Sequence, residues 1–258
     1  MPEPSYKSYI ICTSPRSGST LLCNLLAATG KSGNPGSHFH TPSLSSWLKT
    51  YELSRDDFTS DHDALSAVFD AARKQGTGNT RFFGLRLQRG SFDYFLQQVS
   101  ILHPGLNRDL DRIEAAFGHT LFIHLTRPNK LYQAISHVKA LQTGLWHMSA
   151  DGTELERLSA PKEPVYDASR IARHLAGLSA LDDAWKAWFN REKLHPLQIT
   201  YDELSDDPRD GLARILDQLG LDRKVARDIN PTVAKLADAT NRRWAERFLA
   251  EKDDGQSR

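Results

Sequence analysis

An apolar segment, a polar turn and a leucine-rich segment follow one another over residues 10–22, and this arrangement constrains the fold more than any other feature of the chain. Residues 9–12, Tyr-Ile-Ile-Cys, have the composition of a buried strand. From Thr20 to Ala28 the leucines recur at helical spacing, and Gly30 provides a stop signal. The turn therefore connects the carboxyl end of a predicted strand to the amino end of a predicted helix.

The amino end of this predicted helix is a candidate anion site. The backbone N–H groups that lack a partner inside the helix, at the positive end of its dipole, belong to Ser17, Gly18, Ser19 and Thr20. Arg16 can place its guanidinium on two oxygens of a phosphate or sulfate, and the two hydroxyls that open the helix can donate to the same group. An ATP-type phosphate loop needs Gly in place of Thr13 and Lys in place of Ser19, and this chain has neither. An ordinary serine-capped turn is the alternative.

Further strands are predicted over residues 81–87, 120–126 and 196–201, and each is followed by a segment with helical spacing. Apolar strands that alternate with helices predict an α/β fold with a parallel β-sheet flanked by helices. A length of 258 residues, 39% of them hydrophobic, fits a single domain over residues 1–258. Residues 148–165 show no period and are predicted to be a mobile connection that closes over substrate. Trp185 and Trp188 continue an apolar helical stripe and are interpreted as core residues.

Two further arginines fall at the carboxyl ends of predicted strands, where parallel sheets bind their ligands. Arg86 lies near the end of the second strand, and Arg127 directly follows the third. Ser136 lies two turns into the next predicted helix, where it could share an anion with Arg127. A solvated polar helix face is the alternative for Ser136. Together with the loop, these residues predict a ligand with two separated anionic groups.

The composition argues against several classes of partner. The chain has 33 Lys and Arg against 32 Asp and Glu, so no overall field favours nucleic acid or an anionic membrane. No run approaches the roughly 20 apolar residues of a membrane span, and the first residues lack the pattern of a signal peptide. We therefore expect a cytoplasmic protein. Cys12 and Cys23 are expected to be free thiols in the core, and no metal site is expected.

The run Pro15-Arg16-Ser17-Gly18-Ser19-Thr20 resembles the loop with which sulfotransferases grip the phosphosulfate of 3′-phosphoadenosine 5′-phosphosulfate (PAPS). Residues 124–129 with 133–136 resemble the element whose Arg and Ser hold the 3′-phosphate of PAPS. Gln142, Thr143 and Trp146 and the segments 184–189 and 244–248 also match. On these segments the chain resembles the bacterial trehalose 2-sulfotransferase family of PAPS-dependent carbohydrate sulfotransferases.

The resemblance implies a fold related to P-loop nucleotide hydrolases, with PAPS as co-substrate and no metal. It implies that the phosphosulfate is held by Arg16, Ser17, Gly18, Ser19 and Thr20, and the 3′-phosphate by Arg127 and Ser136. Arg16 would also take up charge on the leaving phosphate. The implied acceptor is a hydroxyl of a carbohydrate, either a trehalose-like sugar or the saccharide of a glycolipid or lipopolysaccharide, and a homodimer is plausible.

The chain departs from the family at the general base. The family has a Gly-x-Pro-x-Glu run, and residues 33–37 end in Ser37 where the glutamate should stand. Either His38 or His40 takes the proton of the acceptor, with His38 preferred, or the activity is weakened. A general base contributes roughly 10²–10⁴ in rate, so a sulfotransferase could survive its loss. The family's C-terminal arginine falls on Thr240, and the nearest substitutes are Arg242 and Arg243.

Two other functions stay open. A small-molecule kinase would use ATP and Mg²⁺, and the absence of a lysine at Ser19 counts against it. A non-catalytic protein that binds a nucleotide or a sugar is compatible with the serine at position 37.

Overall fold

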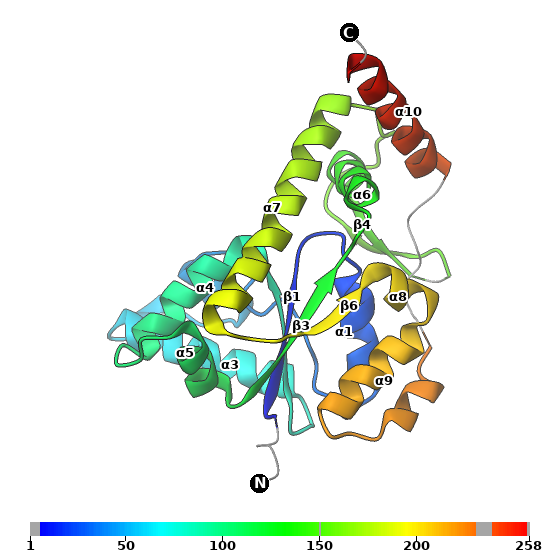
Figure 1. Cartoon of the computed structure of the whole chain (residues 1–258). Coiled ribbons are helices and arrows are strands. Elements are labelled where there is room, and N and C mark those ends of the chain that lie inside the picture. Colours follow the sequence, from blue (N-terminus) through cyan, green and yellow to red (C-terminus); the bar gives the residue numbers. More distant parts are fainter. Residues whose placement is uncertain (1–5, 150, 231–238, 257–258) are drawn as a thin grey trace.

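A four-stranded parallel sheet with the order β2-β1-β3-β6 lies at the centre of the computed structural model, which describes residues 6–149, 151–230 and 239–256 (Figure 1). Its strands are β1 (Ser8–Thr13), β2 (Phe83–Gln88), β3 (Thr120–Thr126) and β6 (Leu197–Thr200). Ser8 pairs with both Phe83 and Thr120, so the first three strands run in step. Because every pairing is parallel, all four carboxyl ends meet at one edge, as predicted for the ligand site.

Helices cover both faces of this sheet, which confirms the predicted α/β class. Along β1, Ile10 and Cys12 face one cluster of buried side chains, while Tyr9 and Ile11 face another. The first cluster packs against α2 (Leu44–Thr50), α3 (Asp61–Thr77), α4 (Arg89–Leu102), α5 (Asp109–Phe117) and the end of α7 (Ala168–Glu192). The second packs against α1 (Ser19–Ala28), α8 (Tyr201–Asp206), α9 (Pro208–Gln218) and the 3₁₀ turn η2 (Arg223–Asp228). A second 3₁₀ turn, η1 (Arg55–Asp57), lies between α2 and α3.

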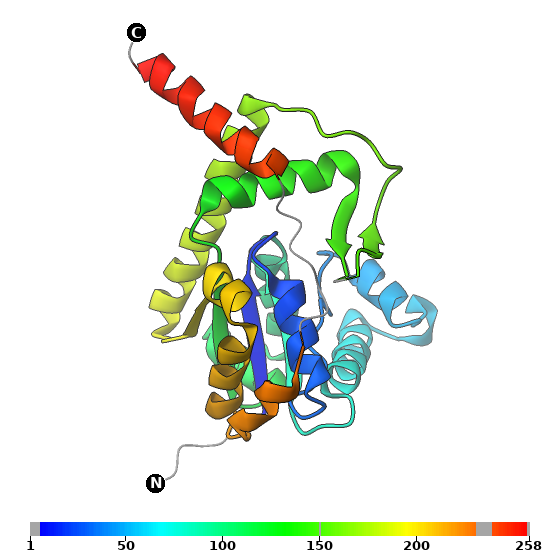
Figure 2. The same cartoon turned by 90° about the vertical axis from the view of Figure 1, so that its right-hand side faces the viewer.

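A third cluster of buried side chains lies beyond the carboxyl edge of the sheet. It joins α6 (Lys130–Thr143) to the first half of α7 and to α10 (Ala239–Gln256). Figure 2 shows α6 crossing above this edge, with α10 packed against it. Trp185 and Trp188, in the second half of α7, are 0% and 2% exposed, which confirms that they are core residues. The helix α6 thus crosses over the edge of the sheet at which the ligand site is predicted.

The prediction of a structureless connection over residues 148–165 is wrong in part. Residues 145–157 form an antiparallel hairpin of β4 (Leu145–Met148) and β5 (Glu154–Arg157), which descends from the end of α6 (Figure 2). Its strands are short and none of its side chains is fully buried, so they carry no apolar alternation for a sequence pattern to reveal.

Two further expectations concern single residues and the membrane. Cys12 and Cys23 are free and buried, as predicted. Across the residues that the structure describes, no helix has the length and apolar character required to cross a bilayer.

Candidate active site

The loop between β1 and α1 leaves the amino end of α1 open. Gly18 is the N-cap residue, with φ 85°, and no side chain caps the helix, so the serine-capped turn is excluded. Arg16 also has a positive φ of 62°, a conformation that costs a non-glycine residue about 1–3 kcal/mol and is found at ligand sites. The Ser17 hydroxyl is buried against Thr13, whereas Ser19 and Thr20 line the cavity above.

Gly18→Ala is expected to weaken the binding of adenosine 3′,5′-bisphosphate at least about tenfold, because a Cβ here would lie 2.6 Å from Cδ2 of Tyr201 and force the loop or the ring to move. Isothermal titration calorimetry measures the effect. Gly30→Ala is the matched control, since Gly30 also has a positive φ, of 59°, but its Cβ would meet nothing within 4 Å. Equal losses of affinity in the two variants would contradict a specific role for the Gly18 contact.

A buried polar network supports the loop from below. The Ser14 hydroxyl donates to Asp182 Oδ1 at 3.2 Å, and Gln133 Nε2 donates to Ser14 Oγ at 3.0 Å and to the Pro15 carbonyl at 2.7 Å. Lys130 forms an ion pair with Asp182. Gln133 and Asp182 are 0% and 5% exposed, so these bonds are shielded from water. The network connects the loop to α6 and α7 and fixes its position.

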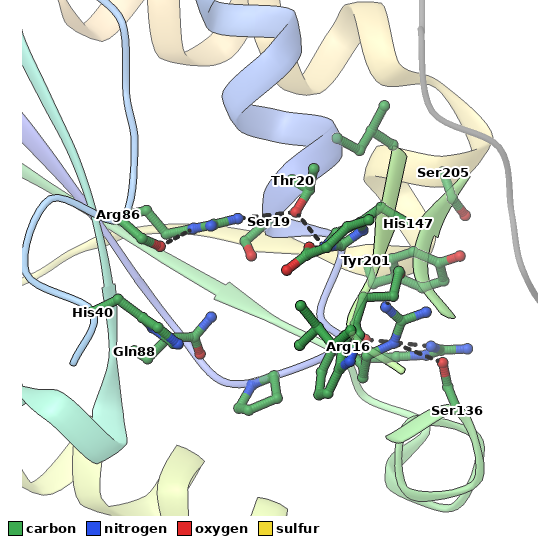
Figure 3. A pocket seen from close by; sticks show the side chains of 18 of the residues that line it. Arg16, Ser19, Thr20, His40, Arg86, Gln88, Ser136, His147, Tyr201 and Ser205 are labelled. Carbon is green, nitrogen blue, oxygen red and sulfur yellow. Dashed lines mark hydrogen bonds and ion pairs between the residues drawn. The ribbon is translucent and has the colours of Figure 1, made fainter. Parts of the chain in front are cut away.

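A cavity of about 480 Å³ opens above the loop (Figure 3). Of the lining residues, three are arginines and one is a carboxylate: Arg16, Arg86, Arg127 and Glu156. Among residues 6–149, 151–230 and 239–256, none of these guanidinium groups is within ion-pair distance of a carboxylate. Three cations without anionic partners at the open end of a helix define a site for a strongly negative ligand.

The buried position of Arg127 at the cavity suits it to bind an anionic ligand. It is 7% exposed, its guanidinium lies over the Tyr201 ring at 4.3 Å, and Nη1 donates to the Arg16 carbonyl at 3.4 Å. Its buried Nε has no hydrogen-bond partner among the described residues. Burial lowers the pKa of Arg127, an effect that Tyr201 and Asp202 oppose. An unpartnered buried donor is costly, and an anion would satisfy it.

Ser136 is bonded to Arg16 instead of Arg127. Arg16 Nε donates to Ser136 Oγ at 3.0 Å, and Nη1 donates to the Trp146 carbonyl (Figure 3). Burial, with a contribution from Arg127, lowers the pKa of Arg16 to about 10, which still leaves it charged at neutral pH. The predicted phosphosulfate loop and the predicted 3′-phosphate residue Ser136 therefore lie next to each other, because α6 packs close to the loop between β1 and α1.

Arg86, which had no assigned role, lies at the other side of the loop. Its Nη1 donates to Thr20 Oγ1 at 2.9 Å, and its Nε donates to Ser37 Oγ at 2.8 Å. Ser37 thus lies beside the Arg86 guanidinium. The family resemblance leads us to expect a glutamate at this position. The hydroxyl carries no charge, so Arg86 remains available to an anion.

The two predicted histidines differ in position. His40 lines the cavity and its side chain is exposed, whereas His38 is 7% exposed and packs against Phe83 with ring centroids 5.9 Å apart. Burial lowers the pKa of His38 to about 4. The preference for His38 over His40 is therefore reversed, because a hydroxyl in the cavity cannot reach a ring enclosed in the core.

Sequence reasoning missed the residues that the hairpin and α8 contribute to the cavity. They include His147, Glu156 and Tyr201. His147 and Glu156 are cross-strand partners in the hairpin, so only the pairing of β4 with β5 brings them together. Arg242 and Arg243, in contrast, are exposed on α10 and do not line this cavity. Thr240 lines a neighbouring cavity of about 640 Å³ that shares Arg16 and Ser136.

The site combines the edge of a parallel sheet, an uncapped helix end and three arginines that have no carboxylate partner among the described residues. This combination is typical of α/β enzymes that act on phosphate or sulfate esters. The sequence model of the family described as Stf0 sulphotransferase matches residues 8–251. The chain belongs to the Stf0 sulphotransferase family and is a sulfotransferase, as the sequence resemblance predicted.

Two curated relatives and a solved structure are similar to this chain. The chain is 28% identical over 265 residues to the trehalose 2-sulfotransferase of Mycobacterium tuberculosis (strain ATCC 35801 / TMC 107 / Erdman), with 95% of each chain covered. It is 27% identical to that of Mycolicibacterium smegmatis, over 93% of this chain and 94% of the relative. A sulfotransferase structure from Alicyclobacillus acidocaldarius aligns with a TM-score of 0.42 at 16% identity, over 96% of this chain and 93% of that one.

Proposed function

We propose that this protein transfers the sulfuryl group of PAPS to a hydroxyl of a carbohydrate, a trehalose-like sugar or the saccharide of a glycolipid or lipopolysaccharide. One observation carries the proposal: three arginines that form no ion pair with a carboxylate of the described residues line one cavity at the open end of α1. PAPS carries charge at two places, the phosphosulfate and the 3′-phosphate, and this arrangement offers cations to both. The names of the two trehalose 2-sulfotransferases support a sugar as the acceptor.

The residues divide between the two charged groups. The backbone N–H groups of residues 17–20, with Thr20 and Arg86 beside them, would hold the phosphosulfate. Arg127, Arg16 and Ser136 would hold the 3′-phosphate, and Arg16, which is itself part of the loop, would also take up charge on the leaving phosphate. By analogy with phosphoryl transfer, positioning and neutralisation of charge would supply most of the rate.

Binding selectivity tests the donor. The protein is expected to bind adenosine 3′,5′-bisphosphate at least about tenfold more tightly than AMP in isothermal titration calorimetry, because the 3′-phosphate adds charge-assisted hydrogen bonds of about 1.5–3 kcal/mol. ATP with Mg²⁺ is the control for the kinase alternative. Equal affinities for the bisphosphate and AMP would contradict the proposed role of Arg127, and metal-dependent consumption of ATP would favour a kinase.

A transfer assay tests the acceptor. PAPS labelled in the sulfuryl group is incubated with trehalose and a panel of cell-envelope saccharides, and we expect label in at least one sugar. Tight binding of the bisphosphate without transfer to any member of the panel would instead support a non-catalytic binding protein, the alternative raised by Ser37.

A further inference from the structure

The β4–β5 hairpin places a histidine and a carboxylate directly above the start of α1. His147 Nε2 lies 3.1 Å from Thr20 Oγ1 and 3.3 Å from Glu156 Oε2, and both side chains line the cavity. Figure 3 shows His147 beside Thr20, with Arg86 joined to the same hydroxyl from the opposite side. Both residues lie within the range 8–251 that the family model matches, but neither is in a motif on which the sequence resemblance was based.

The contacts of Thr20 allow His147 to act as a hydrogen-bond acceptor. Arg86 has only donors, so the Thr20 oxygen accepts from Arg86 at 2.9 Å. The hydroxyl hydrogen of Thr20 can then be donated to His147 Nε2, 3.1 Å away, when the neutral ring carries its own hydrogen on Nδ1. A hydroxyl of the sugar that displaces Thr20 from this bond would meet the same lone pair.

Charge around the ring favours the neutral form in the absence of a ligand. Burial lowers the pKa of His147 to about 4, and Arg16 and Arg86 contribute in the same direction. Glu156 is the carboxylate that faces the ring. An anion bound between the arginines would offset their effect, so we expect the pKa of His147 to rise when the site is filled.

On the basis of the proposed function, we infer that His147 is the general base of the transfer and that Glu156 stabilises its protonated form. The acceptor O–H passes its proton to His147 Nε2 while its oxygen forms the new bond to sulfur. The bond between sulfur and the phosphate oxygen breaks, and its electron pair leaves on adenosine 3′,5′-bisphosphate. The imidazolium then faces Glu156, which carries the charge that Ser37 cannot supply.

His147 differs from the other candidate bases, His38 and His40, in its position. Thr20 opens the helix end where the sulfuryl group would bind, and His147 is bonded to it. The His40 side chain makes no hydrogen bond within the described part of the chain, and His38 is enclosed in the core. The hairpin thus brings a base to the helix end where the sulfuryl group would bind.

A set of four variants tests this assignment. His147→Ala is expected to lower kcat for the sulfation of trehalose, or of another sugar accepted in the panel, by at least about 100-fold. Its affinity for adenosine 3′,5′-bisphosphate should stay within about threefold of the wild type, because the ring carries no charge there. His62→Ala, at an exposed position on α3, is the matched control and should change neither quantity. If His40→Ala abolishes turnover and His147→Ala does not, the assignment is overturned.

Glu156→Gln gives a readout that a merely structural role would not produce. Loss of the carboxylate lowers the pKa of His147, so the acid limb of the kcat–pH profile should move to lower pH while kcat on the plateau falls by about tenfold. An unchanged acid limb would contradict the role of Glu156.

A measurement independent of turnover keeps the two proposals apart. NMR titration of the imidazole nitrogens of His147, with and without adenosine 3′,5′-bisphosphate, is expected to show a higher pKa in the complex and a smaller rise in Glu156→Gln. A bisphosphate that binds without moving the His147 signals overturns the base and leaves the donor proposal standing. A bisphosphate that does not bind contradicts the proposed function itself.

Discussion

Arg127→Ala is expected to weaken the binding of adenosine 3′,5′-bisphosphate by about 100-fold, the value of one or two charge-assisted hydrogen bonds. AMP should bind nearly as it does to the wild type, so the variant loses its selectivity for the bisphosphate. The turnover of PAPS should fall by at least about 10²-fold, as when one donor to developing charge is removed. Calorimetry with both nucleotides and a steady-state transfer assay measure these changes.

Thermal stability distinguishes this role from a structural one. Arg127 is buried and forms no ion pair within the part of the chain that the structure describes, so removal of its charge relieves a desolvation penalty. The melting temperature should therefore not fall by more than the lost contact with Tyr201 requires. Arg81→Ala, an exposed arginine that stacks on Phe82, is the matched control and should bind both nucleotides normally. A variant at Arg127 that loses AMP and the bisphosphate equally would contradict the assignment to the 3′-phosphate.

Asp182→Ala is expected to produce the largest loss of stability, about 3 kcal/mol, because it removes the carboxylate from the partly buried ammonium of Lys130 and the acceptor from the buried Ser14 hydroxyl. The melting temperature should fall by about 10 °C for a chain of this size. The Ser14 hydroxyl loses its acceptor at the same time, so the loop should also bind the bisphosphate less well. Differential scanning calorimetry and isothermal titration calorimetry measure the two effects.

The neighbouring residue provides the control. Asp183 is 73% exposed in its side chain and pairs only with Lys186 on the surface, so Asp183→Ala should cost less than about 1 kcal/mol. The double variant Lys130→Met with Asp182→Leu removes both charges and should recover most of the stability, but not the affinity for the bisphosphate, because Ser14 still lacks its acceptor. Full recovery of both would show that the network does not position the loop.

Local features of the sequence were sufficient for the sheet and for the charged residues at its edge. The predicted strand over residues 120–126 has the bounds of β3, because an apolar run is a property of a few adjacent residues. Arg86 and Arg127 lie at the carboxyl edge because Arg86 is near the end of β2 and Arg127 directly follows β3, and all the strands of a parallel sheet end on the same side.

Local sequence patterns could not predict contacts between segments that are distant along the chain. The choice between His38 and His40 depends on which side chain is enclosed by the core around Phe83, and no local pattern distinguishes them. Ser136 lies against Arg16 because α6 folds back over the loop, 120 residues away along the chain. The sequence did not predict the hairpin because its strands are only four residues long and bury none of their side chains completely.

The sequence by itself determined an α/β chain with an open helix end, three arginines at one edge and membership of a sulfotransferase family. These properties follow from composition, periodicity and a short motif, each read within a few residues. Only the tertiary structure decided which arginine meets Ser136, which histidine reaches the cavity and that Glu156 stands beside His147. Burial and pairing across the fold set these relations, because a side chain's neighbours in space are fixed by packing and not by its neighbours in the chain.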